Sequence, residues 1–142
     1  MPSLSFQKQF VPGIRAMLSK DYAVRLKVKP KRTTIRNMRK RPFKKGDRLI
    51  LFSGLRTKKC EKLGEVRCKK VEDIHLQYVC EVLDMFEVVV NGKTIDDDAI
   101  NLMARQDGFT DGFSMMKWFA KNHGFPFHAQ RIFMDNTYDR KF

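Results

Sequence analysis

A dense run of basic side chains lies in the first half of the chain, between Arg25 and Arg48. This window contains twelve Lys and Arg residues but only one acid, Asp47. Pro30 and Pro42 hold parts of it extended. Because an unpaired buried cation is costly, most of these side chains must face water or an anion. Phosphate groups bind such a segment with release of counterions, so the window predicts a surface for polyanions.

Charge is divided unevenly along the 142 residues, which carry a formal net charge of +13. Residues 1–70 hold 22 Lys and Arg against four acids, whereas residues 71–142 hold seven against twelve. A one-sided field of this kind attracts polyanions and accelerates their association. A second basic cluster, from Arg56 to Lys62, should form a neighbouring loop. The expected partner is therefore nucleic acid, and RNA in particular.

Cations from these two clusters are the expected phosphate contacts. They are Lys29, Arg32, Arg36, Arg39, Lys40, Arg41, Arg56, Lys58 and Lys59. Rings available to stack on bases are Phe43, Phe52, Phe109 and Phe113. Two other interpretations stay open, namely a solvated basic surface without a partner and a surface for an acidic protein.

Metal, disulfide and cofactor chemistry find little support in the sequence. The thiols are Cys60, Cys68 and Cys80, and the imidazoles are His75, His123 and His128. Neither set has the spacing of a zinc site, and three cysteines do not pair evenly. His123 is instead expected near the C-terminal end of a helix, as a partner of the helix dipole. No Gly-rich phosphate loop is present. The start of the chain lacks the features of a signal peptide, and no apolar run approaches the ~20 residues of a membrane span. We expect a cytoplasmic protein without a metal, a cofactor or a membrane contact; its oligomeric state is not indicated.

The elements that position these residues can be predicted from local patterns. We expect strands at 4–7, 33–36, 48–53, 64–71 with an extension to 76, within 78–90 with a core at 86–90, at 93–95 and at 130–134. Helices are expected from Pro12 to near Asp21, over 98–105, and after Thr110 or Asp111. Asn91-Gly92 predicts a tight hairpin. Together they indicate an α+β fold with a small antiparallel sheet. A single domain is expected over residues 1–142, with a core at 4–134 and a frayed tail at 135–142.

Several short motifs in this order resemble the ASCH domain superfamily. They are Lys31-Arg-Thr-Thr34-Ile-Arg36, Pro42-Phe-Lys-Lys-Gly46-Asp47 with the apolar strand after it, Gly54-Leu-Arg-Thr-Lys, Lys62-Leu-Gly-Glu, and Asp107-Gly-Phe109 with Phe113 and Phe119. The resemblance covers residues 28–134 and is strongest to small phage and bacterial members. It implies a PUA-like antiparallel β-barrel with flanking helices.

The same resemblance implies a cleft lined by Lys31, Thr34, Arg36 and Asp107. Members of the family are thought to bind RNA or modified nucleosides. Some resemble an amidohydrolase that acts on N4-acetylcytidine, and ribonuclease activity is attached to others. In the hydrolase-like members the matching Lys and Thr, with a Glu where this chain has Asp107, form the catalytic set.

The chemistry of those side chains leaves two alternatives. A lysine desolvated in a cleft has a lowered pKa, so Lys31 could act as a base or nucleophile beside the Thr34 hydroxyl. Asp107 could then relay a proton or orient the lysine. The alternative is a structural ion pair between Lys31 and Asp107 that closes the mouth of the barrel.

Overall fold

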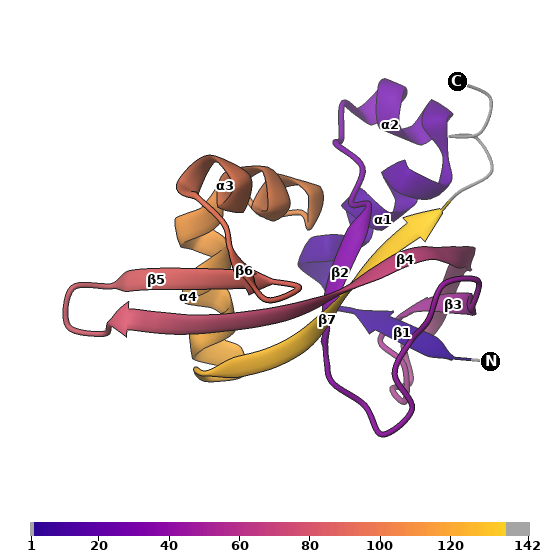
Figure 1. Ribbon diagram of the computed structural model, residues 1–142. Coiled ribbons are helices and arrows are strands. Elements are labelled where there is room, and N and C mark those ends of the chain that lie inside the picture. Colours follow the sequence, from indigo (N-terminus) through magenta and orange to yellow (C-terminus); the bar gives the residue numbers. More distant parts are fainter. Residues whose placement is uncertain (1, 136–142) are drawn as a thin grey trace.

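The computed structural model describes residues 2–135 of the chain. Its elements in chain order are β1 (Ser3–Phe6), the 3₁₀ turn η1 (Lys8–Phe10), α1 (Val11–Leu18), α2 (Lys20–Leu26), β2 (Thr33–Asn37), β3 (Arg48–Ser53), β4 (Glu61–Cys80), β5 (Met85–Val90), β6 (Lys93–Thr94), α3 (Asp97–Gln106), α4 (Gly112–Asn122) and β7 (Phe127–Asp135). The predicted α+β class is confirmed (Figure 1). The expected frayed tail lies, from residue 136 onward, outside the described residues.

Strand β4 is the central and longest strand of the sheet. Its 20 residues pair with β3 at one end, with β7 along the middle and with β5 at the other end. Strand β2 adds to the far edge of β7, and β1 pairs with β3 in parallel. The parallel pair makes the sheet mixed, whereas an antiparallel sheet was expected.

The expected closed barrel is not confirmed. At one end of the molecule the strands form the row β1-β3-β4-β7-β2, and no ladder joins β2 back to β1 within the described residues. The gap is bridged by a side chain, because the Arg36 guanidinium on β2 donates to the Ser5 carbonyl of β1 at 2.9 Å. The sheet is therefore open along the β1–β2 side.

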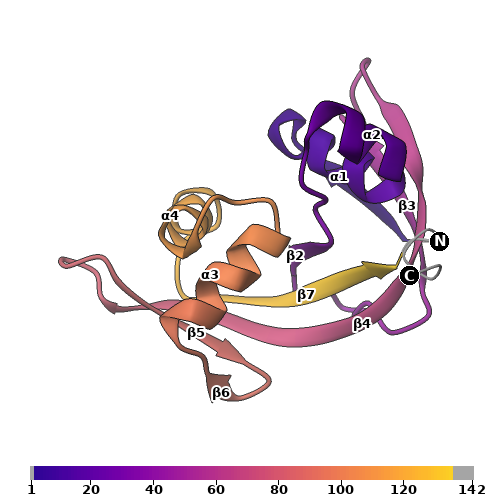
Figure 2. The same ribbon diagram turned by 90° about the horizontal axis from the view of Figure 1, so that it is seen from above.

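Two helix pairs cover opposite ends of the long strands, with β2 between them (Figure 2). Helices α3 and α4 pack on β4, β5 and β7 through a core that includes Ile74, Leu76 and Phe119. Helix α1 packs on β1, β3 and β4 through a second core that includes Met17 and Leu51. Each helix pair with its own core forms one half of the molecule, and the two halves meet in the space between the helix pairs.

Local signals account for most of the element boundaries. The Asp96 and Asp111 carboxylates cap α3 and α4 by accepting from the backbone N–H of Ala99 and Ser114. The predicted helix end near Asp21 is wrong, because the Ser19 hydroxyl accepts from the N–H of Tyr22 and starts α2 there. Residues 78–80, expected with the following strand, belong to β4, and β7 begins three residues earlier than predicted.

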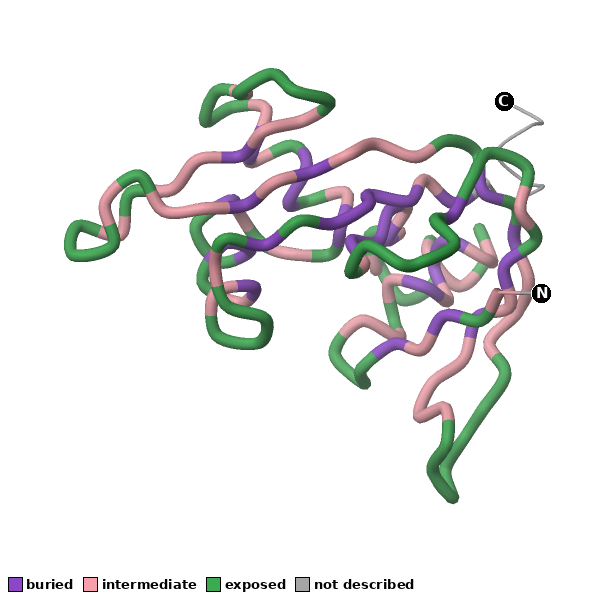
Figure 3. Tube along the Cα trace, turned by 60° about the horizontal axis from the view of Figure 1, so that its bottom comes forward, coloured by how far each residue is buried: buried purple, intermediate pink, exposed green. Residues whose placement is uncertain are grey.

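Runs of exposed residues lie in the connecting loops and in the turn from β4 to β5 (Figure 3). None of the described helices is both long and apolar enough to cross a membrane. Cys60, Cys68 and Cys80 are free thiols.

Candidate functional site

A cavity of about 680 Å³ opens between β1 and β2, where the sheet is not closed. Residues of β1, η1, β2 and the loops after β2 and β3 form one part of its wall. The C-terminal end of α3 and one face of α4 form the other part. The cavity thus lies at the meeting of the two halves, and Lys31, Thr34, Arg36 and Asp107 all line it.

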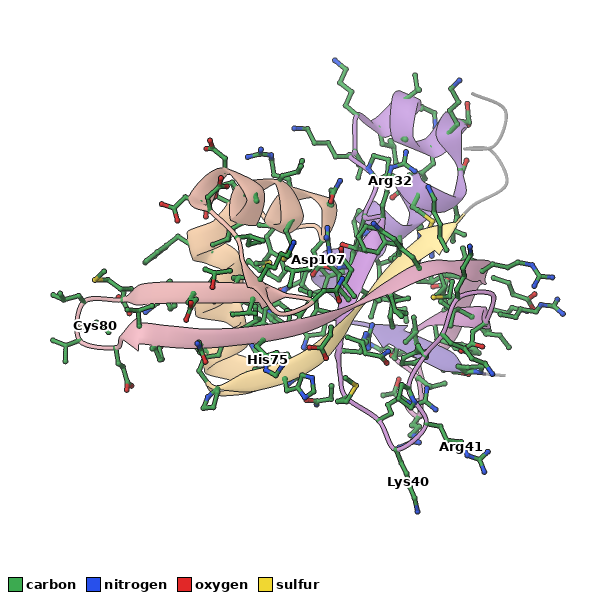
Figure 4. The ribbon with its side chains drawn as sticks, viewed as in Figure 1. Arg32, Lys40, Arg41, His75, Cys80 and Asp107 are labelled. Carbon is green, nitrogen blue, oxygen red and sulfur yellow. The ribbon has the colours of Figure 1, made fainter. Side chains whose placement is uncertain are left out.

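Lys31 and Asp107 form a buried ion pair at this cavity. Their side chains are each 3% exposed, and Lys31 Nζ lies 3.4 Å from Asp107 Oδ2. The same ammonium donates to the backbone carbonyl of Asp107. The Thr33 hydroxyl donates to Asp107 Oδ1 at 3.0 Å. Figure 4 shows Asp107 in the interior between α3 and β2. The expected ion pair between Lys31 and Asp107 is therefore formed.

Backbone hydrogen bonds to α1 and α3 position the side chains of Lys31 and Asp107. The peptide N–H of Lys31 donates to the Gly13 carbonyl in α1 at 2.9 Å, and that of Arg32 donates to the Gln106 carbonyl in α3 at 3.0 Å. Asp107 is the C-cap residue of α3, and Gly108 turns the chain with a φ of +95° that suits glycine. Residues 31–32 thus connect the two helix pairs.

Burial dominates the electrostatics of the pair. Desolvation lowers the pKa of Lys31 below its ordinary value, and the Asp107 carboxylate partly opposes this effect. Desolvation likewise raises the pKa of Asp107, with Lys31 as the main opposing influence. Each group therefore depends on the other to remain charged in the interior.

Arg36 connects the two open edges of the sheet. Its Nε donates to the Thr34 hydroxyl at 3.0 Å, while its terminal nitrogen reaches the Ser5 carbonyl. The guanidinium also lies 4.8 Å from the centre of the Phe6 ring. Burial lowers the pKa of Arg36, and the Asp107 carboxylate opposes that shift. Arg36 thus presents a fixed cation to whatever enters the cavity.

Three aromatic rings form a continuous wall of the cavity. Phe10, Phe109 and Trp118 contact one another with ring centres 5.4–5.7 Å apart. Lys31 Nζ lies 4.9 Å from the centre of the Phe10 ring. Phe109 was one of the expected stacking residues. Phe10 and Trp118 were not, because Phe10 lies in a short turn and Trp118 belongs to an apolar helical stripe, which is typical of a core.

Of the other three rings predicted to stack on bases, only one lines the cavity. Phe43 lines the cavity but is itself buried. Phe52 and Phe113 do not line it. Phe113 is 55% exposed and belongs to a different depression beside β5.

The predicted phosphate-binding cations are only partly brought together. Arg39 and Arg56, from the loops after β2 and β3, reach the cavity that Arg36 lines. Lys29 lines a neighbouring cavity of about 330 Å³ with Lys31. The remaining residues lie outside both cavities; they are Arg32, Lys40, Arg41, Lys58 and Lys59. Lys40 and Arg41 project from the tip of the loop (Figure 4).

The basic loop between β2 and β3 is anchored at one residue. The N–H of Phe43 donates to Gln130 Oε1 at 2.8 Å, and Gln130 Nε2 donates to the Phe43 carbonyl at 2.9 Å. Arg39 lies 4.4 Å from the centre of the Phe43 ring. The anchor therefore places Arg39 at the rim of the cavity.

His123 is a cavity residue that sequence reasoning placed only at a helix end. It is indeed the C-cap residue of α4, and it stacks on the rings of Phe119 and Phe127. Burial lowers the pKa of His123, and the positive charge of Arg36 lowers it further. The cavity wall thus offers a neutral imidazole near neutral pH.

Comparisons with protein-family models, curated proteins and solved structures found no match for this chain. The ASCH resemblance therefore stays a prediction.

Proposed function

We propose that this chain binds single-stranded RNA and holds one unstacked nucleotide in the cavity between β1 and β2. The observation that carries the proposal is the composition of the cavity, with three contacting aromatic rings on one wall and arginines around it. A base can stack on such rings, which contributes about 1–3 kcal/mol per base. The volume of about 680 Å³ falls in the usual range for sites that enclose a small ligand.

The positive charge around the cavity also supports a nucleotide as its ligand. Arg36 is fixed within the cavity, and Arg39 and Arg56 approach it from separate loops. Planar guanidinium groups match the geometry of phosphate oxygens. Lys40, Arg41, Lys58 and Lys59 are exposed farther along the same two loops. They would neutralise phosphates of the flanking nucleotides without reading their sequence.

The family resemblance fits this proposal. The four side chains that it places in a cleft line one cavity. The row β1-β3-β4-β7-β2, with Arg36 spanning its ends, supports a PUA-like barrel that is open on one side. We infer that this opening is the entrance for the nucleotide.

Trp118 provides a direct test, because it is the single tryptophan of the chain and lines the cavity. Short RNA should quench or shift its fluorescence on titration, and labelled RNA should show the same affinity by anisotropy. Arg39→Ala with Arg56→Ala should weaken binding at least about tenfold and flatten the salt dependence. Lys93→Ala with Lys121→Ala removes two exposed cations that do not line the cavity and serves as the control.

Three results would count against this function. Failure of RNA to bind at low salt would rule out the proposed RNA-binding function. RNA that binds without changing Trp118 fluorescence places the ligand on the outer surface instead of in the cavity. Equal losses in the rim and control variants have the same meaning. DNA of the same sequence should bind less tightly if the 2′-hydroxyl is contacted.

The burial of Lys31 supports a second candidate, a hydrolase acting on a modified nucleoside or on RNA. The lowered pKa of Lys31 favours the neutral amine that a base or nucleophile requires. Thr34 offers a hydroxyl held by Arg36 in the same cavity. Incubation with N4-acetylcytidine and with labelled RNA tests this candidate. Product that forms equally with the wild type, Lys31→Ala and Thr34→Val would rule out these catalytic roles.

A further inference from the structure

Two imidazoles and a carboxylate meet on the outer face of the sheet, away from the cavity. His128 Nε2 lies 2.6 Å from Asp73 Oδ1, and His75 Nε2 lies 3.2 Å from Asp73 Oδ2. The two histidine rings are stacked, with centres 4.1 Å apart and planes only 4° from parallel. One ligand atom from each of the three residues lies within 4.8 Å of the other two.

Strand register produces this cluster. His75 on β4 is the direct antiparallel partner of His128 on β7. Asp73 is two residues before His75, so both point to the same face of β4. Ile74 between them is fully buried in the core beneath α3 and α4, which places the cluster on the opposite face. In the view of Figure 4, His75 lies below β4 and Asp107 above it.

The backbone beneath the carboxylate is held in place from the β5–β6 hairpin. The N–H of Asp73 donates to Asn91 Oδ1 at 2.9 Å, and the N–H of Asn91 donates to the Asp73 carbonyl at 2.8 Å. Asn91 itself has a φ of +49° in the tight turn of the hairpin. The backbone of Asp73 is therefore held at a fixed position beside the two histidines.

We propose that Asp73, His75 and His128 bind a divalent transition metal ion of the zinc class. Two imidazole nitrogens and one carboxylate oxygen are typical ligands of Zn²⁺, Co²⁺, Ni²⁺ and Cu²⁺, whereas Mg²⁺ and Ca²⁺ prefer oxygen alone. The three side chains are 42–46% exposed, so the metal can enter from solvent. Three protein ligands leave a further position for water or an external ligand.

Binding requires a small rearrangement of the rings. Nitrogen–zinc bonds measure about 2.0–2.1 Å, and parallel rings do not direct their lone pairs to one point. The imidazoles must therefore tilt toward each other, and their exposure leaves room for this rotation. The Asp73 carboxylate lies against both Nε2 atoms, on the side where the ion would bind.

The site is independent of the proposed RNA cavity. None of its three residues lines the 680 Å³ cavity, and they lie near the Leu76–Phe127 end of the β4–β7 ladder. A bound ion would link two strands that also carry the core, so it should raise the melting temperature.

The chain offers a matched set of variants for the test. Zn²⁺ and Co²⁺ are titrated by calorimetry and by Co²⁺ absorption into protein without a histidine tag. A Cys60→Ser, Cys80→Ser background removes the two cysteines that are not buried. His75→Ala, His128→Ala and Asp73→Asn should each weaken binding at least about tenfold, because even partners outside the ligand shell change affinity by that factor. His123→Ala removes the remaining histidine and should leave the affinity unchanged.

The result expected is binding of one ion per chain with a Co²⁺ spectrum of nitrogen and oxygen ligands, and a melting temperature raised by Zn²⁺ only when all three ligands are present. Failure of the wild-type chain to bind either ion would overturn the proposal. Retention of wild-type affinity in the His75→Ala, His128→Ala double variant would overturn it as well.

Discussion

Lys31 and Asp107, 76 residues apart in the chain, are joined in a buried ion pair between the two halves of the molecule. Lys31 follows the N-terminal helices and is bonded to α1 through its backbone, whereas Asp107 ends α3. Each half has its own hydrophobic core. The pair therefore fixes the position of one half against the other and shapes the cavity between them.

Removing one partner of this pair should be strongly destabilising. Asp107→Asn preserves the shape of the side chain but leaves the Lys31 ammonium buried without a counterion. We expect the free energy of unfolding to fall by about 3–5 kcal/mol in urea denaturation. Arg15→Met breaks an exposed ion pair with Glu61 and should cost less than about 1 kcal/mol. A comparable, small loss in both variants would show that Lys31 is solvated in the native protein.

The Gln130 side chain should control the order of the basic loop. Gln130→Met removes both hydrogen bonds to the Phe43 backbone while keeping a similar volume. We expect trypsin to cleave the loop faster after Arg39, Lys40 and Lys44, and unfolding to cost about 1–3 kcal/mol less. Gln77→Met, which removes a side-chain bond to Glu87 instead, is the control. If both variants are cut at the same rate, the anchor does not hold the loop.

Local chemistry explains which elements were predictable. Asn91-Gly92 forms the expected tight turn with φ values of +49° and +83°, because both positions favour the left-handed region there. The strand over residues 48–53 was predicted with the bounds that β3 has. Helix α2 was missed because Asp21 was taken for a helix end, although an acid in the first turn of a new helix is equally favourable.

Prediction of the site depended on sequence distance. Thr34 and Arg36 follow Lys31 closely, so a short motif suffices to group them. The same motif could not show that Thr33, rather than Thr34, bonds Asp107, because neighbouring strand residues face opposite sides. The open β1–β2 side of the sheet and the cross-strand histidine pair depend on long-range strand pairing and register, which no local pattern encodes.

The Cys68 thiol should resist ionisation and modification. Burial raises the pKa of Cys68 from its ordinary value of 9.0 to about 11, and the charge of Asp47 adds to the shift. Between pH 9 and 11 the unfolded chain loses this proton while the folded protein keeps it. The stability contributed by Cys68 is therefore fully present below pH 9 and is lost as the pH rises through 11.

Two measurements check this behaviour. The difference in unfolding free energy between the wild type and Cys68→Ala should shrink between pH 9 and 11. A thiol reagent at pH 8 should modify the exposed Cys60 long before Cys68. Equal rates at the two cysteines, or a difference that does not change with pH, would contradict the buried thiol.

Gly13 is a helical glycine that cannot be replaced by alanine without displacing Lys31. Alanine is normally favoured over glycine inside a helix by about 1 kcal/mol. A Cβ atom at position 13 would, however, lie 2.9 Å from the Cβ of Lys31 and 3.4 Å from its backbone nitrogen. We therefore expect Gly13→Ala to lower the free energy of unfolding by about 1–3 kcal/mol. RNA affinity should fall as well, because Lys31 lines the cavity.

Urea denaturation and RNA anisotropy of the same protein check both effects of Gly13→Ala. Lys121→Ala, at an exposed position of α4, is the helical control and should change stability by no more than about 0.5 kcal/mol. A Gly13→Ala protein that is more stable than the wild type would mean that α1 and residue 31 are not in contact. The packing that joins the N-terminal helices to the Lys31–Asp107 pair would then be wrong, whatever the effect on RNA.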